Sequence, residues 1–200
     1  MQPVTLIFAT NNQHKVDEIK NIIGNQYHII TLKDAGIDID IPEPYDTLEE
    51  NASEKSSVIY KLTGSDCFSE DTGLEIEALN GEPGVKSARY AGEGKSFEKN
   101  IEKLLDNMQG IENRSAQFRA VLSLIINGTE HKFEGICTGT ILAHTQGEGG
   151  FGYDPIFLPS GAERTFAEME MVEKNRYSHR KKAMDKLVHF LNTTSKNNKN

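Results

Sequence analysis

The stretch Val4-Thr5-Leu6-Ile7-Phe8-Ala9 is a nearly continuous apolar run near the start of the chain. Such a run is typical of a β-strand that is covered on both faces, as in α/β proteins. Residues 15–23 change to a spacing that puts their apolar side chains on one face of a helix, and Gly24-Asn25 supplies a stop signal. The sequence therefore predicts a strand inside a sheet, a short loop and a helix.

The rest of the chain continues this alternation of helices and strands. A helix is predicted over 48–62 before Gly64, a strand over 67–70 before a turn at Thr72-Gly73, and a last helix from Ser178 to 192. Two alternating runs, 116–126 and 131–143, meet at Asn127-Gly128, which is a strong hairpin signal. We predict an α/β fold with a mixed sheet, two lobes forming one domain over 1–192, and a polar tail over 193–200.

Composition narrows the class of protein. Hydrophobic residues make up 36% of the 200-residue chain, which favours a globular fold, and the formal net charge of −8 disfavours nucleic acid as a partner. Cys67 and Cys137 lack the spacing of a zinc site or a disulfide framework, so we expect a cytoplasmic protein. The chain start lacks a secretion signal, and no apolar run approaches the roughly 18 residues of a membrane span, so no membrane partner is expected.

Two lysines occupy positions that suit an anionic ligand. Lys15 ends the segment Thr10-Asn11-Asn12-Gln13-His14-Lys15, which leads from the first strand to the N-terminus of a helix, where backbone amides favour anions. The alternative is that Asn11 or Asn12 caps the helix and Lys15 is solvated. Lys55 lies on the helix face that should be buried, where an ammonium must either reach solvent or meet an anion.

Three carboxylates suggest a magnesium site. Glu70 and Asp71 come at the end of an apolar strand, and Glu43 lies in the segment Ile41-Pro42-Glu43-Pro44, whose prolines restrict the backbone. Mg²⁺ prefers oxygen ligands and commonly takes one or two carboxylates together with substrate phosphates. An ordinary turn at residues 71–73 is the competing interpretation.

Glycines and cations mark two later segments. Residues 147–152 match GxGxxG, but Pro155 follows and no helix begins there, so a dinucleotide fold is rejected. The glycines instead indicate a close approach of the backbone, with Phe151 as a stacking platform or a core aromatic. His179 and Arg180 begin the last helix, where positive charge is disfavoured unless an anion or an electron-rich ligand meets it.

Together these segments resemble the inosine triphosphate pyrophosphatase family, which includes the dITP/XTP pyrophosphatases. The likeness runs almost from end to end, and its motifs occur in the same order. They are Thr10-Asn11-Asn12-Gln13-His14-Lys15, Glu50-Asn51-Ala52 with Lys55, Glu70-Asp71-Thr72-Gly73-Leu74, Gly81-Glu82-Pro83-Gly84, Ser87-Ala88-Arg89-Tyr90, Gly149-Gly150-Phe151-Gly152-Tyr153-Asp154-Pro155 and Ser178-His179-Arg180.

The resemblance implies an elongated, two-lobed α/β enzyme with its site in a central cleft, usually a homodimer. The enzyme would hydrolyse ITP, dITP and XTP to the monophosphate and pyrophosphate with Mg²⁺. Asp71 would be the catalytic base and a metal ligand with Glu43, while Glu70 is a third candidate ligand. The implied substrate-binding set is Thr10, Asn11, Asn12, Gln13, His14, Lys15, Lys55, Thr72, Phe151, Gly152, Tyr153, Asp154, Lys174, His179 and Arg180.

The resemblance also implies which of these residues bind the phosphates and which bind the base. Lys15, Asn12 and Lys55 would hold the triphosphate, and Phe151 would stack on the purine. His179 and Arg180 are donors that suit a 6-oxo group, whereas adenine presents an amino group there. Two alternatives stay open on the sequence: a related pyrophosphatase for other modified or pyrimidine triphosphates, and a nucleotide-binding protein without catalysis.

Overall fold

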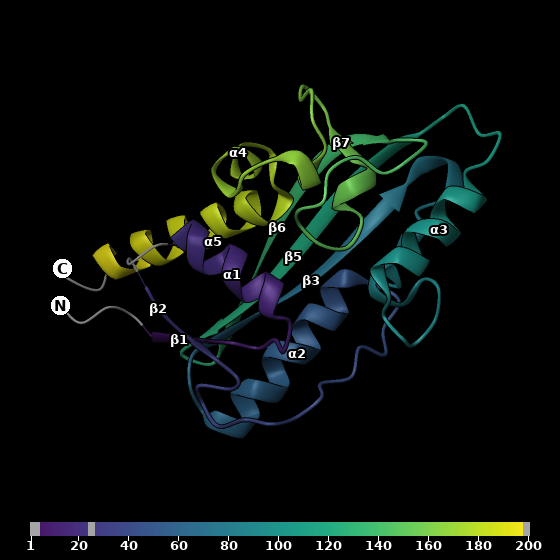
Figure 1. The fold of residues 1–200 in the computed structure, drawn as a ribbon. Coiled ribbons are helices and arrows are strands. Elements are labelled where there is room, and N and C mark those ends of the chain that lie inside the picture. The colour runs from purple at the N-terminus through teal and green to yellow at the C-terminus, as the bar shows by residue number, and fades with distance from the viewer. Residues whose placement is uncertain (1–4, 24–26, 198–200) are drawn as a thin grey trace. The chain divides into compact units, whose positions relative to one another are not determined.

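A computed structural model describes residues 5–23 and 27–197 of the chain. Its strands and α-helices alternate along most of the sequence (Figure 1). In chain order they are β1 (Thr5–Phe8), α1 (Gln13–Ile23), β2 (His28–Thr31), α2 (Leu48–Thr63), β3 (Cys67–Ile76), β4 (Pro83–Gly84), α3 (Phe97–Asn107), β5 (Ser115–Ile126), β6 (Thr129–Ile141), β7 (Phe157–Pro159), α4 (Met171–Tyr177) and α5 (His179–Asn197). Among the described helices none is long and apolar enough to cross a membrane.

The strands form one mixed sheet in the order β2-β1-β3-β5-β6-β7, with β4 paired to β3. As predicted, β1 is an interior strand, parallel both to β2 and to β3. The predicted hairpin is also present: Asn127 and Gly128 join β5 to β6 with φ values of 49° and 78°. Both residues with positive φ match the two-residue turn that this dipeptide favours. The α/β class with a mixed sheet is confirmed.

The chain divides into two compact units, described here separately. Unit 1 comprises Met1–Asp71, Ala120–Gly135 and Arg180–Asn200, and unit 2 comprises Thr72–Arg119 and Ile136–His179. Three of the crossings between units fall inside β3, β5 and β6. The assignment of both units to one domain over 1–192 stays a prediction.

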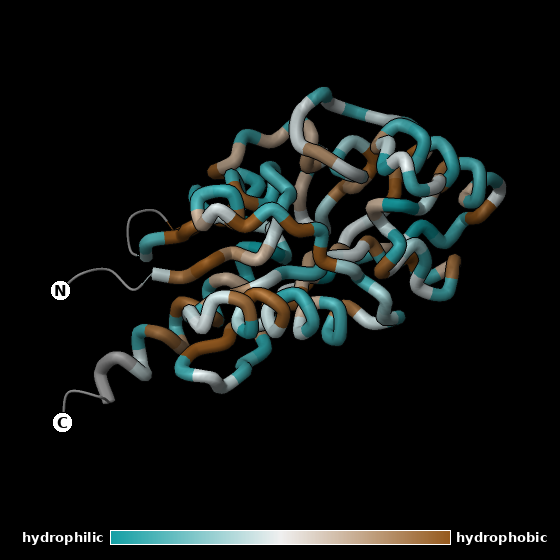
Figure 2. The backbone as a smooth tube through the Cα atoms, turned by 90° about the horizontal axis from the view of Figure 1, so that it is seen from below, coloured by the Kyte–Doolittle hydropathy of each residue, from teal (hydrophilic) through white to brown (hydrophobic). Residues whose placement is uncertain are grey.

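Unit 1 has a separate core on each face of β1 and β3. On one face Leu6, Phe8 and Phe68 pack with apolar side chains of α1 and α5. On the other face Ile7 and Cys67 pack with α2, because successive strand residues point to opposite faces. Figure 1 shows α1 and α5 together on one side of β1 and β3, and α2 on the other. In Figure 2 β1 is brown along most of its length, whereas α5 alternates brown and teal, as a helix with one buried stripe should.

Unit 2 is built around aromatic side chains. Phe118 on β5 packs edge-on against Phe157 on β7 with 4.6 Å between ring centroids, and both lie in a core with Phe166 and Tyr153. Leu104 is the fully buried anchor of α3 in this core. The segment around residues 151–154, which carries the predicted base-binding motif, is therefore supported by packed aromatic rings.

Several local predictions were wrong. Thr72-Gly73 is not a turn, because β3 runs without interruption to Ile76. Gly73 is needed for close packing: a Cβ atom there would come within 2.6 Å of the carbonyl oxygen of Gly84 on β4. Leu62, the last apolar residue of the helix predicted over 48–62, is exposed. Gly64 does end α2, with a φ of 64°.

The two ends of the chain also differ from expectation. α1 begins at Gln13, so Gln13, His14 and Lys15 form its first turn and are not loop residues. α5 continues to Asn197, so residues 193–197 are helical where a polar tail was predicted. The stop signal Gly24-Asn25 and residues 198–200 lie outside the described residues.

Candidate active site

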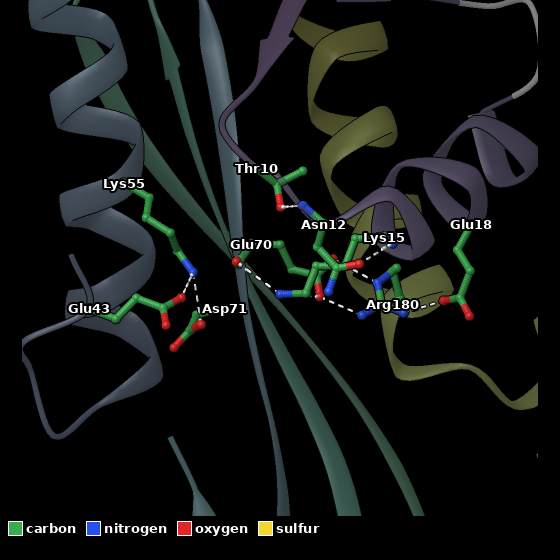
Figure 3. A network of polar contacts seen from close by, with 9 residues as sticks. All are labelled: Thr10, Asn12, Lys15, Glu18, Glu43, Lys55, Glu70, Asp71 and Arg180. Carbon is green, nitrogen blue, oxygen red and sulfur yellow. Dashed lines mark hydrogen bonds and ion pairs between the residues drawn. The ribbon is translucent and has the colours of Figure 1, made fainter. Parts of the chain in front are cut away.

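Lys55 joins two of the predicted metal-binding carboxylates in unit 1. Its Nζ atom lies 2.8 Å from Oδ1 of Asp71 on β3 and 2.7 Å from Oε1 of Glu43 (Figure 3). Strand alternation turns Asp71 toward α2, and the helical position of Lys55 turns its side chain toward β3. The buried lysine therefore meets anions, one of the two outcomes that its position in the sequence left open.

The electrostatics of this cluster favour a charged lysine between two competing carboxylates. Burial lowers the pKa of Lys55, but Asp71 and Glu43 outweigh it, and the net pKa is raised. Burial raises the pKa of Asp71 above its ordinary value, against the opposing effect of Lys55 and Lys15. Burial is the largest cause of the raised pKa of Asp71, and the two nearby carboxylates are the cause of the raised pKa of Lys55. Asp71 is thus a better proton acceptor than an ordinary aspartate.

The donor set of this cluster fits Mg²⁺. Asp71 and Glu43 bring two carboxylates to one point, and Mg²⁺ usually takes one or two carboxylates and fills its other positions with water and phosphate oxygens. Within residues 5–23 and 27–197 there is no group of three or more His, Cys, Asp and Glu side chains arranged around one point, as an all-protein site would require. A site completed by substrate oxygens needs no such group.

Glu70 points to the opposite face of β3 and belongs to a different cluster. Its two carboxylate oxygens each accept a 2.7 Å hydrogen bond from Arg180, one from Nε and one from Nη2. Nη1 of Arg180 donates to Glu18 on α1 (Figure 3). This paired carboxylate lies away from Lys55, so the structure does not bring Glu70 together with Asp71 and Glu43 as a third metal ligand.

The same contacts change the interpretation of Arg180. Its guanidinium is buried between Glu70 and Glu18, and although burial lowers its pKa, these carboxylates raise it further above the ordinary arginine value. The cation at the start of α5 is therefore stabilised by side chains of the protein. The structure places Arg180 in unit 1. Its contact with a purine base stays a prediction.

The predicted phosphate loop has a defined structure at the N-terminus of α1. Oδ1 of Asn12 accepts a hydrogen bond from the backbone nitrogen of Lys15, and Oγ1 of Thr10 accepts one from that of Asn12 (Figure 3). Asn12 is thus a helix cap, as the alternative interpretation predicted. A solvated Lys15, the other part of that interpretation, is wrong, because its side chain is only 14% exposed and its Nζ atom lies 3.7 Å from Oε1 of Glu70. Nζ of Lys15 lies 3.4 Å from the backbone oxygen of Glu70, and burial lowers its pKa.

Of the remaining residues of the segment 11–14, Asn11 and Gln13 form hydrogen bonds with groups other than Lys55 and the carboxylates beside it. Asn11 donates to the backbone oxygen of Ile39 at 2.8 Å, and Gln13 donates to Asp17 on the surface of α1. His14 is exposed. Thr72 is the first residue of unit 2, directly after Asp71 on β3.

In unit 2 the structure brings together Phe151, Asp154 and Lys174. Oδ2 of Asp154 accepts hydrogen bonds from Nζ of Lys174 at 2.6 Å and from the backbone nitrogen of Phe151 at 2.9 Å. The Lys174 ammonium also lies 5.3 Å from the centre of the Phe151 ring. A ring, a carboxylate and an ammonium held together in this way provide stacking, acceptor and donor groups, the groups that a purine base requires.

Residues next to Phe151 and Asp154 in the fold determine how these two side chains are placed. A Cβ atom on Gly150 would come within 2.2 Å of Oδ2 of Asp154, so the glycine permits the close approach that the sequence predicted. Gly152 has a φ of 64°, a conformation that favours glycine. Tyr153 is buried and donates to the backbone oxygen of Ser87, and burial raises its pKa. His179 stacks on Phe118 with 4.9 Å between ring centroids.

Sequence reasoning missed Glu18 and Phe97. Glu18 lies between Val16 and Ile19 on α1 and is buried, so a charge adjacent to the apolar stripe was the available signal. Phe97 begins α3 and its ring centroid lies 6.2 Å from that of Phe151. No feature of the local sequence indicates that contact.

Comparison with known proteins places the chain among enzymes and structures of one family. The model of the Ham1 family matches residues 6–190. A relative from Christiangramia forsetii, named dITP/XTP pyrophosphatase, is 47% identical over 186 residues, which cover 93% of this chain and 98% of the relative. A relative of the same name from Porphyromonas gingivalis is 48% identical over 187 residues, covering 93% and 96%.

Two solved structures of Ham1 proteins are also similar to this chain. The Ham1 protein of Staphylococcus aureus superimposes with a TM-score of 0.86 at 41% identity and covers 95% of this chain and 99% of its own. A HAM1 protein from Coxiella burnetii gives a TM-score of 0.87 at 34% identity, with the same two coverages. The fold, the order of its motifs and these similarities together establish that the chain belongs to the Ham1 family.

Proposed function

We propose that this protein is a pyrophosphatase that hydrolyses dITP, XTP and ITP to the corresponding monophosphate and pyrophosphate. Two near full-length relatives carry the name dITP/XTP pyrophosphatase, which supports the substrate class. The structural observation that carries the proposal is the cluster of Lys55 with Asp71 and Glu43, because it combines a base with cationic and metal-binding groups.

The proposed chemistry breaks the bond between the α-phosphorus and the oxygen that bridges it to the β-phosphate. Asp71 accepts a proton from the attacking water, whose oxygen bonds to the α-phosphorus, and pyrophosphate leaves with the bridging oxygen. The raised pKa of Asp71 brings it closer to the pKa that suits a general base near neutral pH. Lys15 and Lys55 would offset the negative charge of the phosphates, together with the amides at the start of α1.

Mg²⁺ is proposed as the cofactor, held by Asp71 and Glu43. When bound, it would neutralise charge on the polyphosphate and on the leaving pyrophosphate.

The base would be recognised by Phe151, Asp154 and Lys174, with Phe151 stacking on the purine. Lys174 can donate to a 6-oxo group, whereas the 6-amino group of adenine cannot accept such a bond. We also propose that the protein is cytoplasmic and that it is a homodimer. Sedimentation of the purified protein would test the dimer.

A panel of nucleoside triphosphates with Mg²⁺, assayed for pyrophosphate and orthophosphate, tests this function. We expect pyrophosphate as the first product, with dITP, ITP and XTP turned over faster than dATP, dGTP and dCTP. Orthophosphate as the first product would rule out the proposed bond. Faster turnover of pyrimidine or methylated nucleotides would favour a related pyrophosphatase, and binding without any hydrolysis would favour a nucleotide-binding protein.

A further inference from the structure

Asn51 holds the segment that carries Glu43. Its side chain is 1% exposed and makes two hydrogen bonds to the backbone of one residue, Tyr45. The backbone nitrogen of Tyr45 donates to Oδ1 of Asn51 at 3.0 Å, and Nδ2 of Asn51 donates to the backbone oxygen of Tyr45 at 3.0 Å. A carboxamide bonded in this two-point manner fixes both the position and the orientation of the peptide that it holds.

The segment 38–46, all of which the structure describes, belongs to no helix or strand. Pro42 and Pro44 flank Glu43 and have no backbone N–H, so the segment has fewer donors with which to form regular structure. Side-chain hydrogen bonds reach it on both sides of Glu43: Asn11 bonds Ile39, and Asn51 bonds Tyr45. Ile39 and Ile41 also pack against the core, so the two asparagines add directed polar attachment to an apolar one.

The position of Asn51 relates this attachment directly to the active-site cluster. Asn51 and Lys55 are four residues apart on α2, so they lie on the same face of the helix, one turn from each other. The start of α2 is itself held by Thr47, whose Oγ1 atom accepts from the backbone nitrogen of Glu50. One turn of α2 therefore sets the distance between the Tyr45 backbone, which Asn51 binds, and the Lys55 ammonium, which pairs with Glu43.

We infer that Asn51 is a positioning residue for Glu43. By holding Tyr45, two residues beyond Glu43, it keeps the Glu43 carboxylate beside Lys55 and Asp71, where the proposed function requires it as a metal ligand. Groups that orient metal ligands commonly change metal affinity or activity by 10- to 100-fold when removed. The inference rests on the proposed function, but its structural part is independent of catalysis.

The test compares Asn51→Ala with Asn100→Ala. Asn100 is a matched control in unit 2, since it is also buried and bonds backbone groups of Ser87, Ala88 and Ala91. We expect Asn51→Ala to raise the half-saturating Mg²⁺ concentration for pyrophosphate release about tenfold, and Asn100→Ala to leave it unchanged. Asn51→Asp keeps the acceptor but places a second oxygen against the carbonyl oxygen of Tyr45, so it should raise the half-saturating concentration at least as much, and it keeps the shape of the side chain if Asn51→Ala does not fold.

Two further measurements separate positioning from a general loss of structure. Mn²⁺, whose ligand preference resembles that of Mg²⁺, should bind Asn51→Ala more weakly by EPR titration, and the Tyr45 amide should exchange with deuterium faster. In a Glu43→Gln background, Asn51→Ala should have little additional effect on Mn²⁺ binding if it acts through Glu43. Unchanged Mn²⁺ affinity in Asn51→Ala, or an equal loss with and without Glu43, would overturn the inference. A wild-type protein that releases no pyrophosphate would instead refute the proposed function.

Discussion

Glu70 and Asp71 are adjacent carboxylates on one strand, yet they belong to clusters of different character. Glu70 is closed in: its side chain is 0% exposed and both of its oxygens are bonded by the planar guanidinium of Arg180. Asp71 and Glu43 instead share the single ammonium of Lys55, with side chains that are 8% and 28% exposed. Bidentate arginine pairing is rigid, whereas a lysine ammonium can change partners more readily.

This difference suggests a division of labour across β3. The Glu70 cluster ties α1 and α5 to the strand through Glu18 and Arg180, which is suited to holding unit 1 together. In the Asp71 cluster the Glu43 carboxylate stays partly exposed, at 28% of its side-chain surface. A prediction that treats two neighbouring acidic residues as one site misses this distinction, because the strand sends them to opposite faces.

Asp71→Asn should have the largest effect on activity. Removing a general base typically lowers turnover by 10²- to 10⁴-fold, and we expect a loss in that range for pyrophosphate release from dITP. The free energy of unfolding should fall by less than in Glu70→Gln, because Lys55 keeps Glu43 as a partner and burial already opposes the charged form of Asp71. Stopped assays and urea denaturation measure the two quantities.

Glu75→Gln is a matched control for this change, since Glu75 lies on the same strand and contacts Gln117 and Arg119 in unit 2. It should retain near-normal turnover. Normal turnover in Asp71→Asn would remove Asp71 from the mechanism, and an equal loss in Glu75→Gln would show that the assay reports damage to β3 in general.

Glu70→Gln should mainly lower stability, whereas Asp71→Asn should mainly lower activity. The substitution removes the bidentate partner of a buried guanidinium, and breaking a buried ion pair typically costs about 3–5 kcal/mol. Because Glu18 still contacts Arg180, we expect a loss near 3 kcal/mol in the free energy of unfolding, measured by urea denaturation. A Glu70→Gln variant as stable as the wild type but without activity would place Glu70 in the catalytic cluster.

Thiol labelling offers a smaller and more local comparison. Cys67 is buried at the start of β3, and burial raises its pKa to about 12, so little of the reactive thiolate exists in the folded state at pH 8. Labelling should therefore require opening of unit 1, and Glu70→Gln should accelerate it about a hundredfold, the change that a loss of about 3 kcal/mol in the free energy of opening produces. Asp71→Asn should not.

Cys137 is the internal control for this experiment, because it is buried in the core of unit 2. Labelling that rises equally at Cys67 and Cys137 in the Glu70→Gln variant would indicate that both units open together. In that case the Glu70 cluster would stabilise more than unit 1.

Local periodicity and turn chemistry were sufficient to predict much of the architecture. The apolar run of β1, the helical spacing of α1 and the Asn127-Gly128 turn depend on residues that are close in the chain, so their signals survive in one sequence. The prediction of a turn at Thr72-Gly73 was wrong because a contact with a distant strand, and not a local turn, requires the glycine. Gly73 is required by the approach of β4, and the same residue type also marks turns.

The sequence by itself determined that charges occur where a buried strand or a helix start disfavours them, as at Lys55, Glu70 and Arg180. It did not determine how they pair. Only the tertiary structure decided that Arg180 meets Glu70 and Glu18, which are 110 and 162 residues away in the chain, and that Lys55 meets Asp71 and Glu43. The physical reason is that secondary structure follows from neighbouring residues, whereas the partner of a buried charge depends on which elements the fold packs against it.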